Sequence, residues 1–294
     1  MSRSQERARR ILAPASALLL FLQAAIVVTG GAVRLTGSGL GCPTWPECVP
    51  GSYLPVAGQA EGHLRSWIEF SNRLLTFVLV IAALVTLIAV LRAGRRDLRV
   101  LAVGQFLGIF GQGVLGGITV LVQLNPIAVA SHYLLSIILI AAATSLYTRR
   151  HIRAHKKISD LLPDAFSRAH VTLSALVMVL GTVVTGAGPH AGDIDAPRLH
   201  IKIQVAAQLH GLAVVLLLLL TAAFYFSTQT SDVTKKYLLF FAVISFAQGG
   251  IGVIQYYQGV PELLVAAHVA GSTIVWISAW RVWLSVQREE MVPS

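Results

Sequence analysis

The sequence predicts an all-α integral membrane protein in which eight transmembrane helices form two pseudo-symmetric four-helix halves. The chain is 55% hydrophobic and only 12% charged over 294 residues, whereas soluble domains carry about 25% charged residues. Eight apolar runs have the length of about 20 residues that the bilayer core requires. Polar positions also recur between the two halves at a nearly constant offset. The runs lie at about 15–33, 70–91, 100–122, 127–148, 169–188, 203–227, 237–257 and 263–284.

The basic residues are distributed unevenly between the segments that join these runs. With the N-terminus in the cytoplasm, the inner segments hold 18 of the 23 Lys and Arg. The outer side keeps Arg34, Arg65, Arg73, Arg198 and Lys202. This is the positive-inside asymmetry of membrane proteins. It predicts a multi-pass protein of the cell membrane with both termini cytoplasmic. The net charge of +10 therefore indicates a lipid environment and not a nucleic-acid partner.

The second half repeats the first. Gln112 precedes His132 by 20 residues, and Gln248 precedes His268 by the same number, an offset of 136 in both cases. His210 lies 138 residues beyond Asn72. Four spans per half give both halves the same orientation, so the repeat axis should follow the membrane normal. We expect one half at 1–150 and the other at 151–294, joined by a basic inner loop.

The first outer loop, 34–67, is long and rich in glycine and proline, which favours an ordered cap over a bare connector. Its cysteines, Cys42 and Cys48, are the two in the chain. On the oxidising side of a membrane they should form a disulfide. Two free thiols or a metal pair are the alternatives, although a metal site would need more ligands than His63.

Four polar positions fall at similar depth on the second, fourth, sixth and eighth helices: Asn72, His132, His210 and His268. Two histidines on facing helices can hold a haem iron from both sides. We expect His210 and His268 to form such a closed site, suited to electron transfer. The other half offers His132, with Asn72 a poor ligand. An iron there would keep one face open, with Glu69 one turn from Asn72.

Each of these residues also has a simpler explanation. A lone membrane histidine is more often a hydrogen-bonded core residue or a proton relay than a ligand, and the repeat is what favours the ligand interpretation. Glu69 could instead pair with Arg73 or Arg65. Gln112 and Gln248 suit interhelical hydrogen bonds. The outer cations Arg34, Arg198 and Lys202 are candidate partners of haem propionates, or ordinary interfacial residues that extend toward water.

Several segments resemble the bacterial haem A synthases over nearly the whole chain. The most specific is 29–46, which reads TGGAVRLTGSGLGCPTWP. The others are Glu69-x-x-Asn72-Arg73, Gly188-Pro-His-Ala-Gly-Asp193, Leu209-His210-Gly211 and His268. The resemblance implies an eight-helix membrane enzyme that oxidises the C8 methyl of haem O to a formyl group by successive hydroxylations.

The resemblance also implies roles for residues of this chain. His210 and His268 would bind a haem b cofactor, His132 would bind the substrate haem, and Glu69 would serve catalysis beside Asn72 and Arg73. Cys42 and Cys48 match the family's loop cysteines. One position departs from the pattern: many members carry histidine where this chain has Asn72, so the first half cannot be bis-histidine by these positions.

We therefore predict a haem A synthase, supplied by a haem O synthase in the same membrane and reduced by a donor that the sequence does not identify. A homo-oligomer is compatible with this prediction. The runner-up is a di-haem cytochrome b that exchanges electrons with quinone, which would need four ligands. A transporter with parallel repeats would need polar broken helices at mid-membrane.

Overall fold

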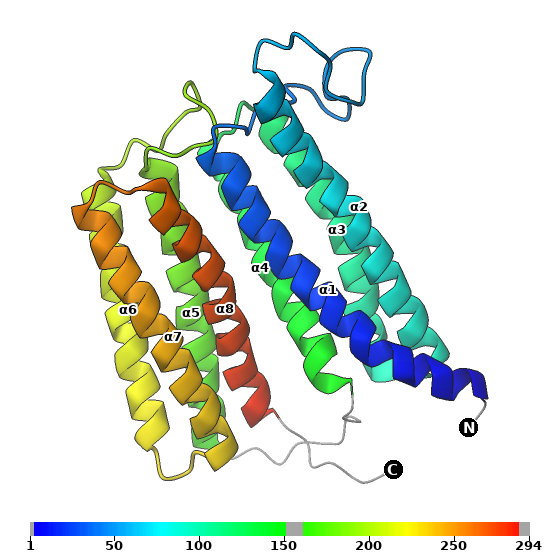
Figure 1. Ribbon diagram of the computed structural model, residues 1–294. Helices are drawn as coiled ribbons and strands as arrows, with labels where there is room; N and C mark the ends of the chain where they lie inside the picture. Colours follow the sequence, from blue (N-terminus) through cyan, green and yellow to red (C-terminus); the bar gives the residue numbers. More distant parts are fainter. Residues whose placement is uncertain (1–2, 151–160, 288–294) are drawn as a thin grey trace.

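The computed structural model describes residues 3–150 and 161–287, which form eight long α-helices and one short 3-10 helix (Figure 1). The elements are α1 (Arg3–Leu35), α2 (His63–Arg92), η1 (Arg96–Leu98), α3 (Arg99–Leu121), α4 (Pro126–Arg149), α5 (Leu161–Ala187), α6 (Ile203–Phe226), α7 (Asp232–Tyr257) and α8 (Glu262–Val286). All eight α-helices are long and apolar enough to cross a membrane. The prediction of an all-α, multi-pass membrane protein is confirmed.

Several helices extend beyond the apolar runs that predicted them. α1 begins at Arg3 and not near 15, and α2 begins at His63 and not near 70. Hydropathy marks only the lipid-buried part of a helix, whereas charged residues such as Glu, Lys and Arg are good helix formers. In the first turns of α1, for example, Glu6 and Arg10 form an ion pair of 2.7 Å one turn apart. The irregular part of the first outer loop is correspondingly shorter than the predicted 34–67.

Each half is a closed ring of four helices. In the first half α1 contacts α2 and α4, and α3 contacts the same two helices from the other side. In the second half α5 contacts α6 and α8, and α7 contacts the same two. The inward face of each ring is therefore built from side chains of all four helices, as in other helical bundles that hold ligands.

The two rings meet through α1–α8, α4–α8 and α4–α5 contacts. Exchange of the halves turns α1–α8 into α5–α4 and leaves α4–α8 unchanged. This is the contact set that a two-fold axis along the helices requires, so the packing agrees with the tandem repeat in the sequence. The predicted boundary between 150 and 151 lies beside residues 151–160, which are outside the described residues.

Hydrogen bonds from aromatic side chains cross this interface at three levels. The indole Nε1 of Trp276 donates to the carbonyl of Ile137 at 2.6 Å, and Nε1 of Trp280 donates to Ser145 at 2.7 Å. Nearer the opposite end of α8, the Tyr133 hydroxyl lies 3.2 Å from the Ser272 hydroxyl. Buried indole and phenol groups need such partners, so these bonds fix the register of α4 against α8.

The loops at one end of the bundle join the halves a second time. The backbone N–H of Gly39 donates to the carbonyl of Gly192 at 2.8 Å. Arg34, at the end of α1, donates to the carbonyl of Thr185 at 2.6 Å and also to that of His190. His190 in turn bonds through Nε2 to the carbonyl of Val260 at 2.7 Å. The loops after α1, α5 and α7 therefore form one connected layer.

α1 begins and α8 ends at the opposite end of the bundle from this layer (Figure 1). The arrangement places the basic segments at one end, as the charge distribution requires. Which end faces the cytoplasm stays a prediction of the positive-inside rule.

Candidate functional site

The second half brings two histidines face to face. His210 lies two turns into α6 and His268 lies at a similar depth in α8, with ring centroids 6.5 Å apart and planes inclined by 69°. An imidazole–metal bond is about 2 Å long and the ring centroid lies about 1 Å behind the nitrogen, so two imidazoles on one metal place their centroids about 6 Å apart. The observed spacing matches a metal held between the rings.

The orientation of His210 is fixed by the backbone of α5. Its Nδ1 lies 3.1 Å from the carbonyl of Val177. Because a carbonyl only accepts, Nδ1 carries the proton and Nε2 keeps its lone pair for a metal. The Nδ1 of His268 is buried and has no hydrogen-bond partner among the described residues. A buried polar atom without a partner is unusual, and the same is true of His132 Nδ1.

A glycine on the neighbouring helix lies beneath each of the four predicted positions. A Cβ built on Gly181 would lie 3.5 Å from Cε1 of His210, and one built on Gly252 would lie 3.6 Å from Cε1 of His268. In the first half a Cβ on Gly116 would lie 3.2 Å from Cε1 of His132. The fourth glycine, Gly30, underlies the Asn72 side chain at 3.9 Å. These glycines give the flat imidazoles a close approach to the helix backbone, and the residue pattern alone did not single out this role.

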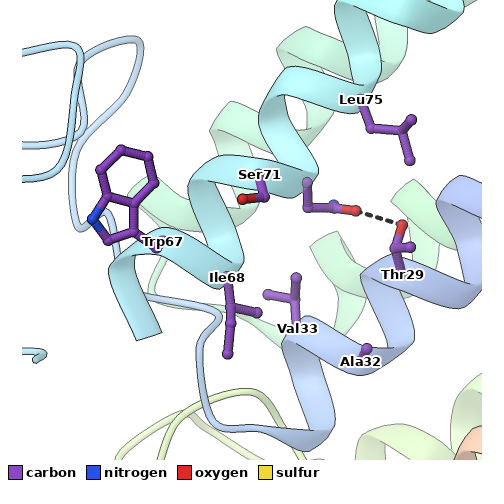
Figure 2. Close-up of a pocket in the computed structure, with 8 residues that line it drawn as sticks. Thr29, Ala32, Val33, Trp67, Ile68, Ser71 and Leu75 are labelled. Carbon is purple, nitrogen blue, oxygen red and sulfur yellow. Dashed lines mark hydrogen bonds between the residues drawn. The ribbon is translucent and has the colours of Figure 1, made fainter. Parts of the chain in front are cut away.

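Asn72 takes a different partner from the histidine in the corresponding place. Its Oδ1 lies 2.7 Å from the hydroxyl of Thr29 on α1 (Figure 2). The side chain lines a groove of about 390 Å³ between α1 and α2, a volume within the range of about 300–1,000 Å³ typical of small-molecule sites. The groove is lined by Thr29, Ala32, Val33, Trp67, Ile68, Ser71, Asn72 and Leu75. His132 and Glu69 are not among these lining residues.

Glu69 and Arg73 form a buried ion pair beneath the first outer loop. Glu69 Oε1 accepts from Arg73 Nη2 at 2.6 Å, and the two side chains are 8% and 21% exposed. Glu69 Oε2 accepts from the backbone N–H of Cys42 at 2.7 Å. Arg73 Nη2 also donates to the carbonyls of Cys42 at 2.8 Å and Thr44 at 3.1 Å. The simpler explanation of Glu69, a pair with Arg73, is therefore seen in the structure together with a loop contact that was not predicted.

The cysteines of this loop are joined. The Cys42–Cys48 disulfide has an S–S distance of 2.04 Å and a Cα–Cα distance of 4.3 Å. The loop is also anchored over the first half, because a Cβ at Gly117 of α3 would overlap the Trp45 indole. The prediction of a disulfide between Cys42 and Cys48 is confirmed.

The donor set suits a metal whose remaining positions are filled by a macrocycle. No group of three His, Cys, Asp or Glu side chains that could hold a metal ion occurs among the residues that the structure describes. Two facing imidazoles, by contrast, supply the two axial positions of a haem iron. The two half-buried rings, the glycines beneath them and the buried Nδ1 of His268 fit such a group.

Sequence comparison adds an independent finding. The family model of the COX15-CtaA cytochrome oxidase assembly proteins matches residues 15–193, which is more than half of the chain. The chain belongs to the COX15-CtaA family. Proteins named haem A synthase are also similar to this chain. The protein of Exiguobacterium sibiricum is 31% identical over 175 residues, which cover 58% of this chain and 57% of the relative.

A second haem A synthase, of Shewanella oneidensis, is 28% identical over 177 residues, which cover 55% of this chain and 51% of the relative. That of Geobacillus kaustophilus is 30% identical over 110 residues, which cover 36% of this chain and 32% of the relative. The chain thus matches just over half the length of the first two. The match to the COX15-CtaA model runs from α1 through α5, so it includes Glu69, Asn72 and His132 and ends before His210.

The outer cations of this COX15-CtaA member bind the loop layer. Arg34 reaches two backbone carbonyls, as described above, and Arg198 donates to the carbonyl of Pro189 at 2.7 Å and to that of Ala196. Lys202 is exposed and occupies the N-cap position of α6. The predicted propionate partners therefore lie at the end of the bundle that carries the loop layer, where the two arginines bind loop carbonyls.

Proposed function

We propose that this chain is a haem A synthase, which oxidises the C8 methyl of haem O to a formyl group by successive hydroxylations. The observation that carries the proposal is the asymmetry of the two halves, with His210 facing His268 in one and Asn72 standing at the matching position in the other. Membership of the COX15-CtaA family and the names of the relatives support the same activity.

In this proposal the half at 151–294 holds a haem b cofactor between His210 and His268. A haem with two histidine ligands supplies one-electron transfer and has no open position for a substrate. The Val177 carbonyl accepts from Nδ1 of His210, which leaves Nε2 free to bind the iron. Gly181 and Gly252 leave room for both rings against α5 and α7.

The half at 1–150 would bind haem O as substrate, with His132 as its axial ligand. Asn72 supplies no second imidazole, so one face of the substrate iron stays free of protein ligands. Thr29 holds the Asn72 amide to one side. The groove beside it is mainly apolar and lies between two membrane-spanning helices, which suits a substrate with a long hydrocarbon chain.

Two roles in catalysis are open to Glu69: it could accept a proton near the reacting methyl, or it could act as a positioning group. Its contacts favour positioning, because one carboxylate oxygen holds the Cys42 N–H and the other holds Arg73. Arg73 also holds the loop, because its guanidinium donates to the carbonyls of Cys42 and Thr44. Through these bonds Glu69 would keep the disulfide cap closed over the first half.

The cell-membrane location with cytoplasmic termini, and the supply of haem O by a membrane-bound haem O synthase, are parts of the same proposal. The basic inner segments support the orientation. A substrate as apolar as haem O favours a supplier within the bilayer.

A di-haem cytochrome b is the competing function. It would need two ligands in each half, and the first half has asparagine hydrogen-bonded to Thr29 where the fourth ligand should lie. This contact weighs against the alternative.

The test is conversion of the substrate by the full-length protein. The chain is expressed in a membrane that contains haem O, and the extracted pigments are separated and identified. We expect haem A or its hydroxylated precursor. The His200→Ala variant, altered at an exposed loop histidine, should convert haem O normally, whereas His132→Ala should not. Absence of both products from an intact, folded wild-type protein would contradict the synthase activity.

A further inference from the structure

Two partly buried glutamines, Gln112 and Gln248, stand in the same relation to two of the histidines. Gln112 lies one turn before Gly116 on α3, and Gln248 lies one turn before Gly252 on α7. Those are the glycines beneath His132 and His268. In each half the Oε1 of the glutamine and the Nδ1 of the histidine are buried and have no hydrogen-bond partner among the described residues. Each half therefore contains a glutamine oxygen that could accept a hydrogen bond and a histidine nitrogen that could donate one, and neither atom has a partner among the described residues.

The geometry places these atoms on one surface. Residues four apart on a helix share a face, with Cβ atoms about 5–6 Å apart. Gln112 and Gly116 therefore lie on the same face of α3. The Nδ1 of His132 lies 3.8 Å from a Cβ built on Gly116. The Gln112 amide already reaches α4 beside this ring, because its Nε2 donates to the carbonyl of His132 at 3.1 Å and to Ser136 at 2.6 Å.

The second half repeats the arrangement, but there the glutamine amide packs against a glycine of α8. The Gln248 amide fills the space where a Cβ of Gly271 would lie, and Gly271 is three residues after His268 on the same face of α8. A larger side chain at that position would displace the amide from the histidine. The glycine therefore allows Gln248 to lie against α8 within one turn of the His268 ring.

A metal-binding histidine nearly always donates its second ring N–H to an acceptor, which fixes the tautomer and raises the basicity of the ligand nitrogen. His210 has such an acceptor in the Val177 carbonyl. His132 and His268 have none among the described residues, although in each case a glutamine with an unpaired Oε1 lies one turn before the glycine beneath the ring.

We propose that Gln112 and Gln248 are positioning residues that accept the Nδ1–H of His132 and His268 when those rings bind iron through Nε2. The inference rests on the proposed haem sites and extends them. It assigns one pattern to both halves. A glutamine amide on the third helix of each half orients the histidine on the fourth helix. The fourth position, Asn72, needs no such acceptor because it is not a ligand.

The experiment compares Gln248→Leu and Gln248→Glu with the wild-type holoprotein in detergent. Two quantities are measured: the midpoint potential of the second-half haem and its rate of transfer to apomyoglobin. Loss of the acceptor should make the imidazole a weaker donor, so Gln248→Leu should raise the potential and release haem about tenfold faster. Gln248→Glu should restore slow release, since a carboxyl group also offers an acceptor oxygen, and its potential should lie at or below that of wild type.

Gln105→Leu is the matched control. Gln105 is a buried glutamine of α3 whose amide is fully used, because it accepts from Gln23 at 2.8 Å and donates to the carbonyl of Leu139 at 2.5 Å. Its loss should lower the melting temperature without a change in the haem potential. Gln112→Leu should likewise leave the second-half potential unchanged and weaken binding of haem O to the first half.

The outcomes separate this inference from the proposed function. A wild-type protein without a low-spin b-type spectrum, or with one that survives His268→Ala, would contradict the haem site itself. A spectrum that depends on His268, together with a Gln248→Leu potential and release rate equal to those of Gln105→Leu, would contradict the role of the glutamine alone.

Discussion

The two halves of the molecule share one scaffold and differ at one of the two polar positions that face each other in each half: asparagine stands at 72 and histidine at 210. Both are closed four-helix rings. In each ring, two polar side chains pack against glycines of the neighbouring helix. In the second half the pair is His210 and His268, and in the first it is Asn72 and His132. If the proposed haem sites hold, the difference teaches that one side chain can separate a site with two protein ligands from a site with one, while the surrounding packing is retained.

The halves also differ in what covers them. The first half carries the disulfide loop, held by Glu69 and Arg73. Their counterparts in the repeat, 138 residues later, are Ala207 and Gly211, which cannot form an ion pair. The half that we assign to the substrate thus carries the disulfide loop, whereas the loop 188–202 in the half that we assign to the resident cofactor contains no cysteine. A cap is of use where a ligand must enter and leave.

Removal of a ligand from the closed half should have the largest effect. We expect His268→Ala to abolish the low-spin b-type absorption of the purified protein, because one axial bond to the iron is lost. His200→Ala, at an exposed loop position, should leave the spectrum unchanged. A full low-spin signal in His268→Ala would break the comparison, since it would mean that the second half is not closed by this pair.

Conversion of the open half into a copy of the closed half is the next test. Asn72→His should change a bound first-half haem from high-spin to low-spin, because a second imidazole could complete the coordination of the iron. Electron paramagnetic resonance of the oxidised protein would measure this change. Asn72→Gln is the control and should remain high-spin. A first-half haem that is already low-spin in wild type would show that another group fills the open face.

The ion pair of Glu69 and Arg73 beneath the disulfide loop predicts a smaller effect, on the free energy of unfolding. Glu69→Gln keeps the acceptor for Cys42 but removes the charge that faces Arg73, and the loss of one member of a buried ion pair destabilises by about 3 kcal/mol. The exposed Glu6–Arg10 pair has side chains 54% and 78% exposed, so Glu6→Gln should cost less than about 1 kcal/mol. Thermal unfolding with intact disulfide measures both. Equal effects of the two substitutions would indicate that the cap is not held by this pair.

The interface between the halves provides the smallest expected change. Trp276→Phe removes the hydrogen bond to the Ile137 carbonyl and should destabilise by about 1 kcal/mol, as is typical of interhelical hydrogen bonds in membranes. The measurement is again the melting temperature, with the spectrum of the second-half haem recorded in parallel. A lost spectrum with an unchanged melting temperature would mean that Trp276 serves the site and not the interface.

Much of the fold could be read from the sequence, because the bilayer imposes a simple rule on helix length and composition. The eight helices, the disulfide and the facing of His210 and His268 all follow from runs, spacing and the repeat. The helix ends did not follow, because residues such as Arg3 and His63 continue the helix outside the apolar region, where hydropathy gives no signal.

The site was predicted less completely, for a reason that is also physical. Besides Arg73, Glu69 binds a backbone N–H 27 residues away, and the partner of Asn72 is a hydroxyl 43 residues away. Contacts of this kind depend on how the loop and α1 settle against α2, and a local pattern does not encode them. The glycines beneath the four positions were visible in the sequence, but their alignment with the histidines requires the packed helices.

The helix contacts between the two rings also have the symmetry of a dimer. A set that maps onto itself under exchange of the halves is what two copies of a single four-helix chain would form as a dimer. In such a dimer of identical copies, any substitution would appear in both halves at once. A single chain that holds both halves is free of that constraint, so asparagine can stand on α2 while histidine stands on α6.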